Sequence, residues 1–162
     1  MRATTVRCAT VAATERCAAT LAGYVAPGQL VVLSGGLGAG KTTFVKAYAA
    51  ALGVDASVTS PSYTLVHHYR CAPGAPVGVL LHADLWRLQD AVEVADLALD
   101  EPLDDGAAAI VEWGERFDVA AGRDHVIVAF SVLPDGSRDL AVDLARSSLP
   151  DDVLAALAET AR

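Results

Sequence analysis

The sequence predicts an α/β fold, a single P-loop domain over residues 1–162 with a largely parallel central sheet and antiparallel additions. Three observations lead to this fold class. The length is that of one ordinary domain built around one hydrophobic core. An apolar strand pattern, a glycine-rich stretch and an amphipathic helix pattern follow one another directly. Farther along, strand and helix patterns alternate, and two turn-forming stretches separate apolar runs.

The chain begins with a strand pattern followed by a helix pattern. Residues 4–9 predict a short strand, and residues 11–25 predict a helix with apolar side chains at four-residue spacing. Thr10 is placed to cap this helix, because a threonine hydroxyl accepts a hydrogen bond from a free amide of the first turn. A proline and a glycine at 27–28 end it.

The central unit is a strand, a glycine loop and a helix. Residues 30–33 form a continuous apolar run, which is typical of a strand covered on both faces of a parallel sheet. Residues 41–52 carry apolar side chains at helical spacing. Gly53 suits the left-handed conformation in which many helices end.

The second half of the chain adds strands, two hairpins and two helices. The expected strands are residues 62–69, 77–83, 107–111, 126–132 and 140–144. Turn-forming residues at 71–76 and at 134–137 indicate hairpins between the first two and the last two of these strands. The expected helices are a short acidic one over 91–99 and a C-terminal one over about 150–161.

Composition and charge exclude several classes of protein. With 53% hydrophobic and 20% charged residues and no run of 18 apolar residues, the chain is neither disordered nor membrane-spanning. A net charge of −8 opposes a basic nucleic-acid groove. Three cysteines without a C-x-x-C pair indicate neither a disulfide framework nor structural zinc. The first residues lack the apolar core of an export signal, so we expect a cytoplasmic protein.

The glycine-rich stretch matches the phosphate-loop pattern G-x-x-x-x-G-K-[ST], which starts at Gly35. Its glycines let successive amides point at one anion, at the positive end of the following helix. Lys41 is expected to reach the β and γ phosphates, the hydroxyl of Thr42 to bind magnesium, and Thr43 to add a phosphate contact. The predicted phosphate-binding residues are Gly36, Leu37, Gly38, Ala39, Gly40, Lys41, Thr42 and Thr43.

A magnesium ion at such a loop needs a carboxylate at the end of a neighbouring strand. Asp84 and Glu112 both end apolar runs, and their spacing does not rank them. One is expected to bind the metal, while the other orients water or senses the γ-phosphate. His82 is interpreted as a packed core residue, and Trp86 and Trp113 as aromatic packing beside the acids.

Four segments together resemble the TsaE family. They are Gly36–Phe44, Ser60–Val66, His82–Leu88 and Val111–Trp113, in the family's order and spacing. The resemblance spans residues from about 4 to 145. It implies a small P-loop α/β fold and a bacterial ATPase, dependent on ATP and magnesium, that works with the TsaB and TsaD proteins. These proteins make the threonylcarbamoyl adenosine modification of transfer RNA.

The resemblance also assigns roles that the spacing leaves open. It makes Thr42 and Glu112 the magnesium residues and leaves Asp84 as the second acid, important for hydrolysis. The expected catalytic residues are Asp84 and Lys41. By the same resemblance Val11 and Thr14 lie near the adenine, and Arg138 approaches the nucleotide.

The chain departs from the family at three positions. The family commonly has aspartate, threonine and tyrosine at Gly36, Ser62 and Trp86. A supporting role for a carboxylate at Gly36 therefore does not carry over, nor does a tyrosine hydroxyl at Trp86.

Two other functions fit a P-loop domain of this length. A small-molecule kinase usually closes an arginine-bearing lid over the transferred phosphate. Here Arg116 and Arg123 are the only arginines between Glu112 and the last hairpin. A nucleotide-dependent binding module that has lost hydrolysis would need the same acids to hold metal. Phosphate release with and without partners separates these functions. We expect contact with transfer RNA to be indirect, through TsaD and TsaB.

Overall fold

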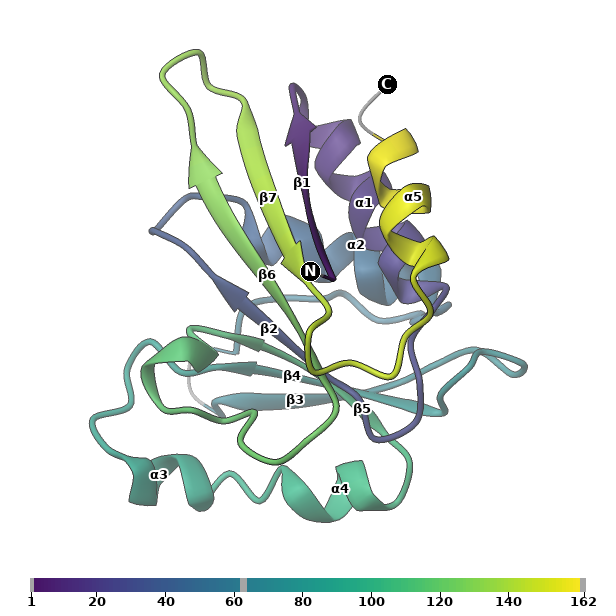
Figure 1. Ribbon diagram of the computed structural model, residues 1–162. Helices are drawn as coiled ribbons and strands as arrows, with labels where there is room; N and C mark the ends of the chain where they lie inside the picture. Colours follow the sequence, from purple (N-terminus) through teal and green to yellow (C-terminus); the bar gives the residue numbers. More distant parts are fainter. Residues whose placement is uncertain (1, 62–63, 161–162) are drawn as a thin grey trace.

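The computed structural model describes residues 2–61 and 64–160, and within them the strands form one seven-stranded sheet (Figure 1). The order of strands across the sheet is β1-β7-β6-β2-β5-β4-β3. The strands are β1 (Ala3–Cys8), β2 (Leu30–Ser34), β3 (Val66–Arg70), β4 (Val79–Asp84), β5 (Ala108–Glu112), β6 (His125–Val132) and β7 (Arg138–Asp143).

The sheet has a parallel centre and antiparallel edges, which confirms the predicted fold class. β2 pairs in parallel with β5 and with β6, and β4 pairs in parallel with β5. The antiparallel pairs are β3 with β4, β6 with β7 and β1 with β7. Both predicted hairpins are therefore present, and they widen the sheet at opposite edges.

Helices cover both faces of this sheet. They are α1 (Val11–Ala22), α2 (Lys41–Ala51), α3 (Ala91–Ala95), α4 (Asp100–Asp104) and α5 (Asp152–Glu159), with a 3₁₀ turn, η1 (Gly114–Arg116). The helices α1, α2 and α5 lie on one face, and α3 and α4 lie on the other (Figure 1). Each face has its own buried apolar cluster. The architecture thus has three layers, as is usual for parallel sheets.

The strand β2 shows why a continuous apolar run is needed at the centre. Val31 and Leu33 join the apolar cluster beneath α1 and α2, whereas Leu30 and Val32 join the cluster on the opposite face. Successive side chains of a strand point to opposite faces, and both faces of β2 are covered. Every one of these four side chains is buried.

Aromatic packing holds α2 against the sheet. Phe44 is 1% exposed and meets the ring of Phe130 edge-on at 5.6 Å between centroids. Tyr48, one turn later, is stacked with Phe44 at 6.3 Å. Burying a phenylalanine side chain stabilises the fold by about 1.5–3 kcal/mol. This contact fixes the helix that begins at the end of the glycine loop.

Most predicted elements lie within two residues of their observed bounds, and the caps are as expected. The hydroxyl of Thr10 accepts a hydrogen bond from the amide of Ala13 at 3.2 Å. Gly53 has φ of 70°, so it ends α2 in the left-handed region. The predicted C-terminal helix is α5, and residue 161 of the prediction lies outside the described residues.

Three predicted bounds are wrong. The first helix ends at Ala22 rather than at residue 25, in a turn closed by hydrogen bonds from residues 24 and 25 to carbonyls 21 and 22. The helix predicted over 91–99 ends at Ala95, since Ala98 lies at φ of 50° and cannot continue a right-handed helix, and a separate helix that was not predicted, α4, begins at Asp100.

The third wrong bound is the start of the strand over 62–69. Residues 62 and 63 lie outside the described residues. The strand β3 begins at Val66, since Leu65 has φ of 62° and interrupts the extended backbone.

No helix within residues 2–61 and 64–160 is long and apolar enough to cross a bilayer.

Candidate functional site

The glycine loop connects β2 to α2 and sets the floor of a pocket. Gly35 has φ of 135°, and a Cβ atom there would lie 2.8 Å from the carbonyl oxygen of Phe130. Gly40, at φ of 108°, is the residue immediately before the first residue of α2. A Cβ atom on Gly40 would meet the Nε of Arg138 at 3.4 Å. Backbone conformation therefore favours glycine at both ends of the loop, and close approach of the Phe130 backbone adds a second reason at Gly35.

Lys41 starts α2 and is almost fully buried, at 5% exposure. Its Nζ donates hydrogen bonds to the carbonyl oxygens of Gly35 at 2.7 Å and Gly36 at 2.8 Å. The ammonium also lies 4.1 Å from the centre of the Trp113 ring, within cation–π range. Burial lowers the pKa of Lys41 below its ordinary value, although Glu112 and other nearby acids act in the opposite direction. The loop thus holds a desolvated cation at its centre.

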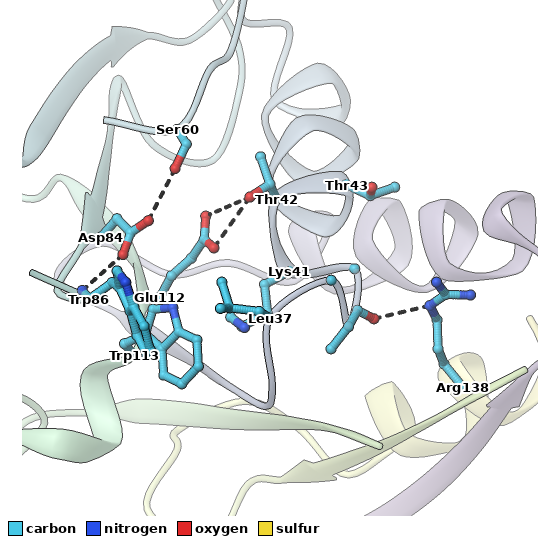
Figure 2. Close-up of a pocket in the computed structure, with 13 residues that line it drawn as sticks. Leu37, Lys41, Thr42, Thr43, Ser60, Asp84, Trp86, Glu112, Trp113 and Arg138 are labelled. Carbon is cyan, nitrogen blue, oxygen red and sulfur yellow. Dashed lines mark hydrogen bonds between the residues drawn. The ribbon is translucent and has the colours of Figure 1, made fainter. Parts of the chain in front are cut away.

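Thr42 and Glu112 face each other across the pocket (Figure 2). The Thr42 hydroxyl lies 3.3 Å from each carboxylate oxygen of Glu112. Glu112 is only 3% exposed, and its Oε1 also accepts a hydrogen bond from Nε2 of His82 at 2.9 Å. A hydroxyl and a carboxylate are oxygen ligands of the kind that magnesium prefers.

Asp84 lies beside this pair and is held by two hydrogen bonds (Figure 2). Its Oδ2 accepts from the hydroxyl of Ser60 at 3.1 Å, and its Oδ1 accepts from the amide of Trp86 at 3.0 Å. The first bond ties Asp84 to the loop after α2, and the second shapes the turn after β4. The carboxylate is half-buried and lines the pocket.

The sheet register explains why these side chains converge. Asp84 pairs with Glu112, and Leu33 at the end of β2 pairs with Glu112 from the other side. Parallel strands bring their carboxyl ends to the same edge of a sheet, where ligands bind in open α/β sheets. His82 and Asp84 are two residues apart, so they share one face of β4, and that face carries α2.

Two tryptophans close the side of the pocket. Trp113 follows Glu112 and adopts a left-handed backbone, with φ of 62°, which is unusual for a bulky residue. Its ring centre lies 4.5 Å from that of Trp86, which is 46% exposed. Gly114 permits the following turn, because a Cβ atom there would lie 2.9 Å from Val119. The strained turn after β5 therefore brings an indole over Lys41.

Arg138 supports the opposite end of the loop. Its Nε donates to the carbonyl oxygen of Ala39 at 3.0 Å (Figure 2). In the register of β7 and β1, Arg138 pairs with Cys8. α1 begins three residues after Cys8, so the start of α1 is carried close to this side of the loop. Val11, on that start, is 54% exposed, whereas Thr14 is buried at 1%.

One cavity of about 320 Å³ collects most of the predicted residues. Its lining includes Leu37, Gly38, Ala39, Gly40, Lys41, Thr42, Thr43, Asp84, Glu112 and Arg138, together with Ser60, Trp86 and Trp113. Gly36 belongs to the same loop and contributes its carbonyl to Lys41, but it does not line the cavity. Val11 and Thr14 do not line it either. Those two positions stay a prediction about adenine.

Sequence reasoning missed two contacts of this site. The sequence predicts His82 as a core residue, and its ring is buried, but it also hydrogen-bonds Glu112. Trp113 was interpreted as packing near an acid, and it also covers the ammonium of Lys41. The alternation of His82 with Asp84 along one strand was the available signal for the first contact. No sequence signal gives the left-handed turn that directs Trp113.

A phosphate loop between a central strand and the next helix, with acids ending two neighbouring strands, defines the P-loop class of α/β proteins. The family model described as "Threonylcarbamoyl adenosine biosynthesis protein TsaE" matches residues 8–140. The chain belongs to the TsaE family.

Individual relatives agree with this assignment. A protein of Treponema pallidum (strain Nichols), "tRNA threonylcarbamoyladenosine biosynthesis protein TsaE", is 37% identical over 117 residues, which cover 71% of this chain and 82% of the relative. A protein of the same name from Bacillus subtilis (strain 168) is 32% identical over 127 residues, covering 78% and 77%. The solved structure described as "Crystal structure of Bacillus subtilus YdiB" superimposes with a TM-score of 0.66 at 22% identity. That match covers 99% of this chain and 95% of the solved one, so it supports the fold.

Proposed function

We propose that the protein binds ATP with magnesium and hydrolyses it, as a component of tRNA threonylcarbamoyladenosine biosynthesis. The observation that carries this proposal is the meeting of Lys41, Thr42, Asp84 and Glu112 in one pocket at the phosphate loop. The pathway comes from the family and from the names of the relatives.

The residues of the pocket fit a nucleoside triphosphate. Gly38 and Gly40 line the pocket at positive φ, conformations that let backbone amides turn toward phosphate oxygens. Lys41 supplies a buried positive charge at the same place. Thr42 and Glu112 supply neighbouring oxygen atoms for magnesium. When bound, magnesium neutralises phosphate charge and polarises the bond to be cleaved.

The remaining groups prepare the site for hydrolysis of ATP to ADP and phosphate. Lys41 exchanges its contacts with the loop carbonyls for phosphate oxygens, since both are hydrogen-bond acceptors and the phosphate is charged. Asp84, held by Ser60 and Trp86, is positioned to orient a water molecule near the γ-phosphate. Trp113 and Trp86 exclude solvent from one side, which strengthens the electrostatic contacts.

The arginines after β5 argue against the kinase alternative. Arg116 donates hydrogen bonds to the carbonyl oxygens of Leu85 and Trp86, at 3.3 and 2.6 Å. Arg123 is paired with Asp100 and Asp104, at 2.8 and 2.9 Å. Neither arginine lines the pocket. A lid that delivers arginine to a transferred phosphate is therefore not built from these two side chains.

Partners complete the proposal. We propose that the protein acts in the cytoplasm with TsaD and TsaB, the partners that the resemblance implies, and that its hydrolysis resets or drives the cycle of their complex. The net charge of −8 makes the TsaD and TsaB proteins, rather than this chain, the source of affinity for transfer RNA.

The test is a reconstitution. Light scattering measures the assembly of this protein with TsaD and TsaB, with ATP and magnesium, with ADP, and without nucleotide. Phosphate release is measured in the same samples. We expect ATP to favour assembly and the partners to accelerate release. The proposed function would be refuted if the extent of assembly were the same with ATP, with ADP and without nucleotide, and no phosphate were released in any sample. Binding and assembly without phosphate release would instead favour the module that has lost hydrolysis.

A further inference from the structure

The carboxylate of Glu112 has a second contact behind the pocket, the imidazole of His82 on the adjacent strand. The Nε2 to Oε1 distance is 2.9 Å, and the side chains of His82 and Glu112 are 0% and 4% exposed. His82 does not line the cavity. It lies on the sheet side of Glu112, among positions of β4 and β5 that are otherwise filled by aliphatic residues such as Leu80 and Ile110.

The two carboxylate oxygens of Glu112 have different hydrogen-bond partners. Oε1 accepts from His82 and from Thr42, whereas Oε2 has Thr42 alone among the described residues. A carboxylate without the first bond could rotate about its last two side-chain torsions. The imidazole removes that freedom and leaves Oε2 as the oxygen that is open to a ligand in the pocket. Groups that hold metal ligands in this way commonly change metal affinity or activity 10- to 100-fold when they are replaced.

The contact with Glu112 also assigns a role to one ring nitrogen of His82. Glu112 can only accept, so Nε2 must carry the hydrogen. Nδ1 is buried and has no hydrogen-bond partner among the residues that the structure describes. A histidine here therefore leaves one ring nitrogen buried without a hydrogen-bond partner among these residues, which costs the desolvation penalty of that group. An aliphatic residue would fill this core position without that penalty, so packing alone does not account for histidine.

We propose that His82 is the positioning residue of the metal-binding carboxylate, holding Glu112 through its Nε2–H so that Oε2 and the Thr42 hydroxyl face a magnesium ion together. This inference rests on the proposed function, because it assigns His82 a role in the same magnesium site. It adds a residue outside the pocket to the machinery that sets the metal requirement.

Two substitutions separate positioning from packing. His82→Leu keeps an apolar side chain but removes the donor, and His82→Gln keeps an N–H donor at a comparable reach. His68→Leu is the matched control, since His68 is exposed on β3 and lies away from the pocket. The midpoint of magnesium dependence is measured for binding of a non-hydrolysable ATP analogue and for phosphate release. ADP affinity without metal and the melting temperature are measured alongside.

We expect His82→Leu to raise the magnesium midpoint by about 10- to 100-fold while metal-free ADP affinity stays within about twofold. His82→Gln should recover part of the loss, and His68→Leu should behave as wild type. In the metal-free wild-type protein, long-range ¹H–¹⁵N NMR should show a hydrogen on Nε2 of His82.

Several results would overturn the inference. A folded His82→Leu protein with the wild-type magnesium midpoint would do so, as would an equal loss of metal-free ADP affinity, because that indicates a structural role only. If His82→Leu does not fold, the glutamine variant and the NMR spectrum decide, and a ring without hydrogen on Nε2 is then contrary to the proposal. A wild-type protein without magnesium-dependent binding would refute the proposed function itself and this inference with it.

Discussion

The substitution Asp84→Asn removes the charge of this side chain while keeping its two hydrogen-bond contacts. Oδ1 accepts from the Trp86 amide and Oδ2 interacts with the Ser60 hydroxyl, at 3.0 and 3.1 Å. In Asp84→Asn the carbonyl oxygen still accepts from Trp86, and the new amide donates to Ser60. Asp84→Ala loses both hydrogen bonds. At about 1 kcal/mol for each bond, alanine lowers the free energy of unfolding by about 2 kcal/mol.

These values convert into melting temperatures. For a domain of this size 1 kcal/mol corresponds to about 2–4 °C, so alanine should lower the melting temperature by about 4–8 °C. The Asp84→Asn substitution should lower the melting temperature by less than about 2 °C. Hydrolysis should fall by about 10²-fold or more in both variants, because each loses a positioned acid that acts on the transition state. ATP affinity should be retained.

The assay compares wild type, Asp84→Asn and Asp84→Ala at equal ATP occupancy. Titration calorimetry sets the occupancy, and phosphate release and multiple-turnover RNA modification are followed with TsaD and TsaB. ATP-driven assembly should survive in both variants while repeated cycles fail. Wild-type turnover by Asp84→Asn would refute the catalytic role of the carboxylate. Loss of ATP binding in that variant would show instead that Asp84 supports the pocket.

The site and the fold make four further predictions. Lys41→Ala should lower magnesium-ATP affinity by about 10²-fold or more by calorimetry, since the phosphates lose charge-assisted hydrogen bonds; unchanged affinity in a folded variant counts against the phosphate loop. Glu112→Gln should raise the magnesium concentration needed for hydrolysis and leave metal-free ADP binding nearly normal; a wild-type magnesium titration would make Asp84 the better metal ligand. Gly35→Ala should lower the free energy of unfolding by about 1–3 kcal/mol in a denaturant titration, because the new Cβ meets a carbonyl oxygen at 2.8 Å; an unchanged midpoint contradicts this. The isolated protein should bind bare transfer RNA no more tightly than about 10⁻⁶ M at physiological salt in a filter assay; a nanomolar complex would show that the acidic surface does not prevent direct contact.

The strand β2, the glycine loop and the helix α2 could be predicted from the sequence because each depends on a few consecutive residues. The apolar run at β2, the glycines after it and the apolar spacing of α2 each reflect a requirement of a few consecutive residues. The hairpin at 134–137 is local in the same sense, since its turn residues alone define it. Two of the three bounds that failed depend on single backbone angles at Leu65 and Ala98, residue types that do not favour positive φ.

The sequence predicted most residues of the site but not the contacts between them. Spacing gave two acids without ranking them, and only the resemblance assigned Glu112 to magnesium. The structure adds the register in which Asp84 and Glu112 are partners on adjacent strands. It also adds His82 behind Glu112 and Trp113 over Lys41. These contacts depend on strand pairing and on a strained turn, and neither is encoded by residue spacing within one segment.

The strand order has a consequence for how the chain folds as it is synthesised. β2 lies at the centre of the sheet, between β5 and β6, yet both neighbours follow it in the sequence by more than one element. When β2 and α2 leave the ribosome, both hydrogen-bonding edges of β2 are still unpaired. Such edges are templates for aggregation until they are covered. The phosphate loop is therefore made early, but its carboxylate wall at β4 and β5 and its supporting arginine on β7 arrive later, so nucleotide affinity should be among the last properties the folding chain acquires.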